Sequence, residues 1–200
     1  MRSAPVTVTG EGVGINDALT MTENIARETG LGHKETLHLR LLAEELFGLI
    51  RSIAGEVEAT YWIENADQSF ELHMTSAVKM TDEIREQLIS ASSDKKNAAA
   101  KGFMGKVRVM IIDALFSMKD AMSYAMMDTV STYPLGGSPE MITMWSMDVY
   151  KDEIRQHIKD NDEAAQAWDE LEKSIIANIA DNIKVKVVGK NVEIAVYKSF

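Results

Sequence analysis

The chain of 200 residues contains no cysteine. Disulfide bonds, thiolate metal sites and cysteine nucleophiles are therefore excluded, and the composition fits a reducing setting such as the cytosol. No stretch approaches the roughly 18 apolar residues that a membrane-spanning helix needs, and the N-terminal stretch has no apolar core of signal-peptide length. We therefore expect a soluble, cytoplasmic protein.

Positive charge is also scarce in this chain. Lys and Arg together number 21 against 31 Asp and Glu residues, which gives a formal net charge of −10. A surface of this sign has no general attraction for phosphate backbones or anionic lipids, so neither nucleic acid nor a membrane is an expected partner. Metal-ligand spacing is absent from the four histidines, so no metal site is predicted from His33, His38, His73 and His157.

The apolar content is high enough for one sizeable core. Apolar residues make up 46% of the chain, and a domain of this length buries roughly 70% of the surface that its unfolded chain exposes. We expect a single domain over residues 1–200. It divides into an N-terminal unit at 1–78, a helical lid or insertion at 79–163, and a closing helix and hairpin at 164–200.

The N-terminal unit combines two helical patterns with strand-like alternation. Asn16 or Asp17 is the expected cap of the first helix, and Gly30 marks its end. The predicted elements are a strand at Val6–Val13, a first helix up to Thr29, a second helix at His33–Ala54, and hairpin strands at Glu56–Glu64 and Ser69–Met74. This order is not a βαβ rhythm, so we expect an α+β sandwich with helices on one face of the sheet.

The remainder of the chain is mostly helical by its periodicity. The predicted helices are Lys79–Ser93, Val107–Met126, a short helix at Met141–Val149 and a longer one at Ala164–Asp181. Two prolines and two glycines predict a loop at Tyr133–Pro139. The chain is expected to close with a hairpin of Ile183–Val187 and Val192–Val196.

The stretch LLAEELFGLIRSIAGEVEATYWIENADQSFELHM, residues 41–74, resembles the ATPase fold called GHKL. Gyrase, heat-shock chaperones, histidine kinases and mismatch-repair proteins share this fold, and the chain is most similar to the branch of anti-sigma serine kinases. The resemblance covers residues 1–78 and about 170–200. It implies a two-layer sandwich of a mixed or antiparallel sheet with helices on one face, plus a helical insertion, with ATP and Mg²⁺ as cofactors.

The family's helix glutamate, which polarises water or a substrate hydroxyl, corresponds to Glu45, the implied catalytic residue. The magnesium-binding asparagine four residues later corresponds to Leu49, and a leucine cannot coordinate magnesium. The adenine-binding Asp-x-Gly motif corresponds to Thr75 and Ala77, where a threonine hydroxyl accepts a hydrogen bond more weakly than a carboxylate. Two of the three motif positions therefore depart from the family.

The family's flexible lid is flanked by glycines, which best match Gly102 and Gly105. Backbone N–H groups at the start of the following helix, near Lys106, would face phosphate. The helices that begin at Lys106 and at Ala164 are both candidates for the family's third helix. By resemblance, the implied nucleotide-binding residues are Glu45, Thr75, Ala77, Lys101, Gly102, Gly105 and Lys106.

Two features allow simpler interpretations. Glu45 is also explained as a carboxylate at the edge of the core or in a surface ion pair. Nine of the 13 methionines lie between Met104 and Met147, where they form either an adaptable core or a groove for a partner.

Three functions are consistent with the sequence. The departures from the family motifs favour a regulatory binding module on a histidine kinase-like ATPase scaffold, with a protein partner and with weakened or lost ATP binding. The first alternative is an active ATP-dependent serine kinase of the anti-sigma type, or an ATPase. The second is a dimerisation protein, in which the helical insertion forms a homodimer contact. The sequence leaves open whether the protein is an enzyme.

Overall fold

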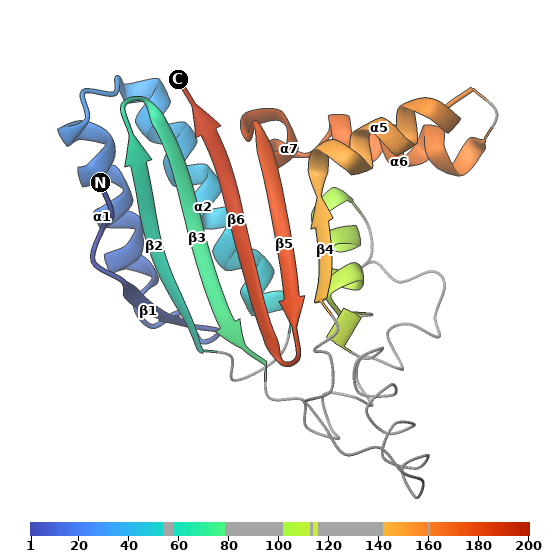
Figure 1. The fold of residues 1–200 in the computed structure, drawn as a ribbon. Helices are drawn as coiled ribbons and strands as arrows, with labels where there is room; N and C mark the ends of the chain where they lie inside the picture. The colour runs from blue at the N-terminus through green and yellow to red at the C-terminus, as the bar shows by residue number, and fades with distance from the viewer. Residues whose placement is uncertain (54–57, 79–101, 113, 116–141, 160) are drawn as a thin grey trace, which may run out of the picture.

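The computed structural model describes residues 1–53, 58–78, 102–112, 114–115, 142–159 and 161–200 (Figure 1). Its elements are β1 (Val6–Thr9), α1 (Ile15–Glu28), α2 (His33–Ile53), β2 (Glu58–Ala66), β3 (Ser69–Ala77), β4 (Ile142–Ser146), α5 (Met147–His157), α6 (Asp162–Glu172), α7 (Ile175–Ile179), β5 (Asn182–Val188) and β6 (Asn191–Ser199). Residues 103–112 are also helical. The described strands form one antiparallel sheet in the order β1-β2-β3-β6-β5-β4. The predicted α+β class is therefore confirmed.

The helices that cover the sheet lie on one of its faces. In Figure 1, α1 and α2 run behind β1, β2, β3 and β6, and the helical residues 103–112 lie behind β4. The front face carries no helix of the described residues. We call it the open face and its opposite the covered face. The helices α5 and α6 project sideways beyond β4.

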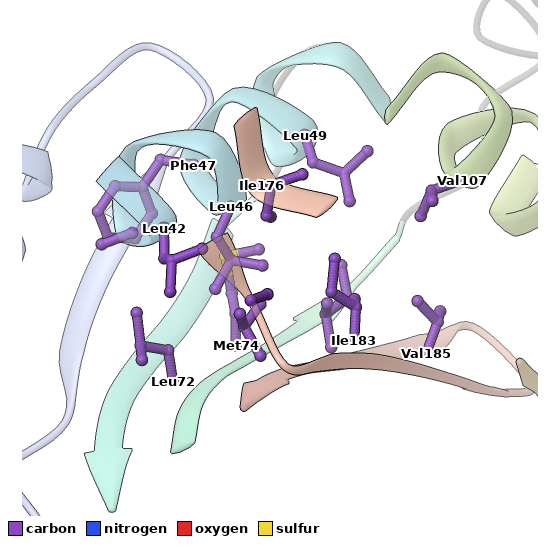
Figure 2. Close-up of a cluster of buried hydrophobic side chains, with 14 of the residues drawn as sticks. Leu42, Leu46, Phe47, Leu49, Leu72, Met74, Val107, Ile176, Ile183 and Val185 are labelled. Atoms are coloured by element: carbon purple, nitrogen blue, oxygen red, sulfur yellow. The ribbon is translucent and has the colours of Figure 1, made fainter. Parts of the chain in front are cut away.

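The covered face carries the hydrophobic core. Because side chains alternate along a strand, Leu72 and Met74 of β3 and Ile183 and Val185 of β5 all point toward the helices (Figure 2). The residues of α2 that are buried against them are Leu39, Leu42, Ala43, Leu46, Phe47 and Leu49. Burial of one such Leu or Phe side chain contributes about 1.5–3 kcal/mol, so this stripe is what holds α2 on the sheet.

The first helix begins earlier than its sequence indicates. We expected Asn16 or Asp17 as the cap, but α1 begins at Ile15 and its cap is Gly14, so that prediction is wrong. Gly14 has φ 76°, and a Cβ at this position would lie 2.0 Å from the backbone oxygen of Thr7. Because only glycine tolerates both conditions, the close approach of β1 to α1 sets the start of the helix. Its predicted stop at Gly30, with φ 81°, is confirmed.

A second correction concerns the predicted helix at Met141–Val149. The structure has the strand β4 at Ile142–Ser146, paired with β5, and the helix α5 begins only at Met147. Ser146 caps α5, since its hydroxyl accepts a hydrogen bond from Val149 N at 3.3 Å. The backbone hydrogen bonds between β4 and β5 favour a strand more strongly than the local helical spacing favours a helix. That spacing depended on apolar residues that lie on opposite faces of the strand.

The predicted helix at Ala164–Asp181 is divided in the structure. The helix α6 ends at Glu172 and α7 begins at Ile175, with the Ser174 hydroxyl as the cap of the second piece. The predicted helix at Val107–Met126 begins earlier, at residue 103. Its part beyond residue 115 lies outside the described residues, as do the helix predicted at Lys79–Ser93 and the loop predicted at Tyr133–Pro139.

Both predicted hairpins are confirmed. The strands β5 and β6 are joined at Gly189 and Lys190, and β2 and β3 at Asp67 and Gln68. The turn between β2 and β3 has two residues, fewer than the predicted connection of four. Asp67 has φ 53°, a conformation that Asp tolerates in a tight turn. None of the helices in the described ranges is long and apolar enough to cross a bilayer.

Candidate functional site

Glu45 lies on the flank of α2 that faces away from α1. It is half-buried, between the buried side chains of Leu42 and Leu49, so it borders the apolar stripe as the helical spacing predicts. Its neighbour Glu44 lies on the other flank, where its carboxylate accepts a hydrogen bond from Arg40 Nε at 2.9 Å. Of the two glutamates, Glu45 is therefore the one beside the core.

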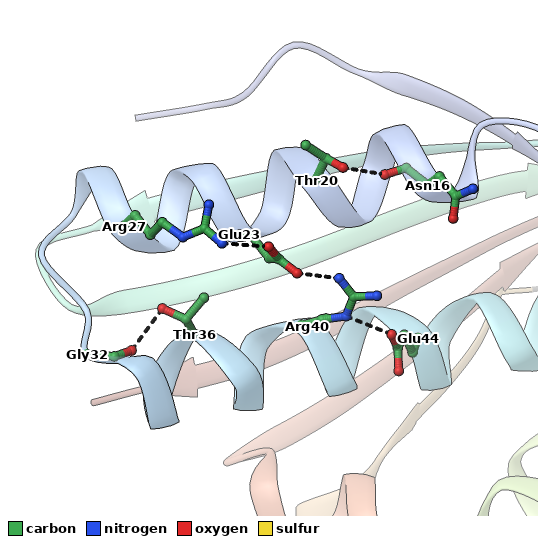
Figure 3. Close-up of polar contacts among 8 residues, drawn as sticks. All are labelled: Asn16, Thr20, Glu23, Arg27, Gly32, Thr36, Arg40 and Glu44. Atoms are coloured by element: carbon green, nitrogen blue, oxygen red, sulfur yellow. Dashed lines mark hydrogen bonds and ion pairs between the residues drawn. The ribbon is translucent and has the colours of Figure 1, made fainter.

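Glu44 belongs to an ion-pair network that joins α1 to α2 (Figure 3). Arg40 bonds to Glu44 and also to Glu23 of α1, which in turn accepts a hydrogen bond from Arg27 at 2.7 Å. The hydrogen bond from Arg40 is the main reason why the pKa of Glu23 is lowered; desolvation of the carboxyl opposes it, and the charges of Arg40 and Arg27 lower the pKa further. The network is a structural link between the helices.

Leu49, which the resemblance aligns with the family's magnesium ligand, lies in the core. Its side chain is 3% exposed and belongs to the same buried cluster as Ile176 of α7 and Val107 (Figure 2). A leucine offers no oxygen to a cation that requires hard oxygen ligands. Among the described residues there is also no group of three His, Cys, Asp or Glu side chains that could hold a metal ion. The residues at this position do not fit magnesium.

Thr75 and Ala77 lie on the opposite side of the sheet from Glu45. Their neighbours Met74 and Ser76 are 1% and 5% exposed on the covered face, and successive side chains of a strand point to opposite faces. Thr75 and Ala77 therefore point to the open face, whereas α2 and Glu45 lie over the covered face. The structure does not bring the implied catalytic glutamate together with the implied adenine contacts.

A surface hollow of about 830 Å³ lies where Thr75 and Ala77 end β3. Its charged side chains are Glu11, Glu58 and Glu193, none of which has an ion-pair partner among the described residues. Three carboxylates repel a triphosphate. The described residues that line the hollow are Thr9, Gly10, Glu11, Val13, Glu58, Thr60, Thr75, Ser76, Ala77, Asn191, Val192 and Glu193.

The implied phosphate-binding residues lie in a third place. Gly102, with φ 80°, precedes the helical residues 103–112, and Lys106 N donates to its carbonyl at 3.2 Å. Gly105 lies inside this helix, and Lys106 Nζ lies 2.9 Å from Glu170 Oε2 of α6. Lys106 is therefore engaged in an ion pair that joins two helices. Lys101 lies outside the described residues.

The open face carries an aromatic stack that the sequence did not predict. The rings of Trp62 and His73 are 5.0 Å apart and inclined by only 5°. The guanidinium carbon of Arg2 lies 4.7 Å from the Trp62 ring, and Trp62 Nε1 donates to Glu64 Oε1 at 3.1 Å. His73 Nε2 lies 3.3 Å from Glu71 Oε2, but neither ring nitrogen makes a hydrogen bond of suitable geometry.

The turn length explains why this stack was missed. A connection of four residues, as predicted, would place Trp62 opposite Glu71. The turn at Asp67 and Gln68 shifts the register by two residues and places Trp62 opposite His73. The sequence signal that indicates the correct register is a hairpin turn of two residues with Asp at the position of positive φ.

No protein-family model, no curated protein and no solved structure matches this chain. The α+β class is therefore supported by the structure alone. The function of the site is therefore inferred from which residues lie close together in the structure and which lie apart.

Proposed function

We propose that this protein is a regulatory binding module on a histidine kinase-like ATPase scaffold, in which ATP binding is weakened or lost. The observation that carries the proposal is the separation of the implied nucleotide residues. Glu45 lies in the helix layer, whereas Thr75 and Ala77 open onto the other face of the sheet. A nucleotide cannot contact both sets at once, because the sheet lies between them.

The order of the elements supports the scaffold part of the proposal. A strand, two helices and a hairpin occupy residues 1–78, and a helix followed by a closing hairpin ends the chain. The helices that pack on the sheet do so from one side only (Figure 1). This is the two-layer arrangement that the resemblance implies.

The electrostatics and the burial support the loss of ATP binding. Phosphoryl transfer depends on a metal ion and on cationic groups that neutralise the phosphates. Leu49 is buried at the metal position, and Lys106 is paired with Glu170. The hollow beside Thr75 has three carboxylates and no Lys or Arg among its described lining residues.

Exposed apolar side chains support a protein partner. Met144 of β4 is 74% exposed and Val149 of α5 is 68% exposed, and they flank the junction where the chain passes from strand to helix. Large apolar side chains gathered at one place on a surface are typical of interaction sites, and methionine adapts to varied partners. This corner is accessible because the helices α5 and α6 project sideways beyond the sheet (Figure 1).

The nucleotide part is tested by calorimetric titration of the full chain with ATP and with ADP, each in the presence of Mg²⁺. We expect no magnesium-dependent binding by the wild type or by the Glu45→Ala variant. Glu44→Ala is the matched control, because it removes the adjacent carboxylate on the flank of α2 that carries the ion pair with Arg40. Saturable magnesium-dependent binding that is lost in Glu45→Ala but kept in Glu44→Ala would support the active kinase instead.

The partner part is tested by placing a photo-crosslinking amino acid at Val149 and expressing the protein in its native cells. We expect one discrete crosslinked product, with a mass that differs from that of two joined copies of this chain. The control is the same amino acid at Leu37, which is 46% exposed on the outer side of α2. Equal labelling from both positions, or none from Val149, would contradict a partner at this corner.

A further inference from the structure

The open face carries charges of opposite sign on two strands that are symmetric about its centre. The strand β2 presents Glu58 and Glu64 on this face, and β5 presents Lys184 and Lys186. The strands β3 and β6 lie between them, at the centre of the sheet. Neither lysine has an ion-pair partner among the described residues, although Lys184 Nζ lies 4.8 Å from the Tyr197 ring.

This face is nearly neutral, in contrast to the chain as a whole. Its strand positions carry four glutamates, and Lys184, Lys186 and Arg2 supply three positive charges. The whole chain has a formal net charge of −10. Two copies of the chain therefore repel each other least when their open faces approach, and the opposite charges on β2 and β5 then attract.

The residues of the central row across the open face are complementary in the same way as the charges. The Trp62 and His73 rings stand side by side on β2 and β3. In the same row across the sheet, β6 carries the small residue Ala195 and β5 carries Lys184. In this row, two stacked rings thus lie beside an alanine and a cation.

We propose that the open face binds a second copy of this chain about a twofold axis that runs parallel to the strands, between β3 and β6. This axis places β5 of one protomer over β2 of its partner, and β6 over β3. Lys184 then lies against Trp62 of the partner subunit, a favourable cation–π pair, with Glu64 of the partner subunit beside it. Ala195 receives the ring of the partner subunit's His73.

The His73 ring lies near the centre of the proposed contact. The ring is only 13% exposed, and both of its nitrogens lack a hydrogen bond, which is costly for buried polar atoms. Glu193 and Tyr197 flank Ala195 on the same face of β6. Because the two nitrogens have almost no solvent-accessible surface of their own, a hydrogen bond to Glu193 of the partner subunit or to Tyr197 of the partner subunit requires the His73 ring to turn out of its stack.

The face is large enough for a stable dimer. Six strands of four to nine residues, about 4.8 Å apart and about 3.3 Å long per residue, give a projected area of about 700 Å². A standard interface buries about 800 Å² of accessible surface per partner, and accessible surface exceeds projected area. Two such sheets pack about 10 Å apart, which the lysine stems and aromatic rings can fill.

Sedimentation velocity of the full chain over a range of concentrations tests the proposal. We expect the wild type to dimerise. Lys184→Glu/Lys186→Glu should raise the dimer dissociation constant by about 100-fold or more, because like charges then face each other. Glu58→Lys/Glu64→Lys should do the same. An equimolar mixture of the two variants should restore the dimer, since each supplies the charges that the other has lost.

The matched control is Lys34→Glu/Lys159→Glu, which makes the same charge change at exposed positions away from the open face and should leave the dimer intact. Circular dichroism verifies that each variant folds, and the mixing experiment separates a lost contact from a lost fold. A wild type that stays monomeric, a dimer that persists in both reversed variants, or a mixture that stays monomeric would overturn the proposal. None of these outcomes depends on nucleotide binding.

Discussion

The two faces of the sheet are built from the same strands but differ in chemistry. On the covered face, β2 presents Tyr61 and Ile63, which are 0% and 1% exposed beneath α1 and α2. On the open face, the same strand presents Thr60 and Trp62 among charged neighbours. The covered face gives the protein its stability, whereas no helix of the described residues covers the open face.

This difference bears directly on the candidate site. A nucleotide site of the implied kind requires a helix glutamate, a metal ligand and a strand-end acceptor on one side of the sheet. Here Leu49, which the resemblance aligns with the metal ligand, lies in the core, and Thr75, which it aligns with the acceptor, is on the open face. The comparison of the two faces therefore predicts how each residue responds to substitution.

The largest effect is expected when the family's asparagine is placed in the core. Leu49→Asn removes buried apolar contacts and buries an amide, which should lower the free energy of unfolding by about 2–5 kcal/mol. It should not create magnesium-dependent ATP binding. The matched control on the same helix is Leu37→Asn, where a side chain that is 46% exposed should cost under about 1 kcal/mol.

Urea denaturation measures both Leu→Asn variants, and calorimetry tests them for ATP. Equal losses of stability at positions 49 and 37 would show that Leu49 is not a core residue. A gain of magnesium-dependent ATP binding in Leu49→Asn would mean that the site is intact except for its metal ligand.

The fold was largely predictable from the sequence because its periodic patterns reflect burial. The stripe of α2 and the alternation of both hairpins follow directly from which residues face the core. The strand β4 was not predictable in this way, because Met144, Trp145 and Val149 also have helical spacing. Only the pairing with β5, which is distant in the sequence, decides that Ile142–Ser146 is extended.

The candidate site was less predictable. The flank position of Glu45 followed from its helix, but the face occupied by Thr75 depends on the register of β3. The ion pair between Lys106 and Glu170 joins residues 64 positions apart, and no local pattern indicates it. The stack of Trp62 on His73 required the correct turn length.

The second prediction concerns the aromatic stack on the open face. Trp62→Ala removes a ring pair and a cation–π contact, which should destabilise the monomer by about 1–2 kcal/mol. This is less than the core substitution, because the face is open to solvent. A double-mutant cycle with His73→Thr, by urea denaturation at a concentration where the chain is monomeric, isolates the ring–ring part. A coupling energy of zero would show that the rings do not interact.

The third prediction compares one tyrosine on each face. Tyr61 is fully buried and its hydroxyl lies 2.9 Å from Thr22 Oγ1, so Tyr61→Phe should cost about 1 kcal/mol. Burial also raises the pKa of Tyr61. Tyr197 lies on the open face, and Tyr197→Phe should change stability by less than about 0.5 kcal/mol. Thermal unfolding of both variants at a concentration where the chain is monomeric decides, and a larger loss from Tyr197→Phe would contradict the assignment of the two faces.

The smallest effect is expected on the solvent side of the helix layer, at Glu23. The hydrogen bond from Arg40 lowers the pKa of this carboxyl below its ordinary value of 4.5, so the ionised form stabilises the fold. That contribution is present above the unfolded pKa and is lost as the pH falls through the lower folded pKa. Glu23→Gln should therefore be slightly less stable than the wild type at neutral pH, and the difference should vanish in acid. Because the pair is solvent-accessible, added salt should also reduce it. Urea denaturation across the acidic pH range tests this, and a difference that grows as the pH falls would show that Arg40 does not stabilise the Glu23 carboxylate.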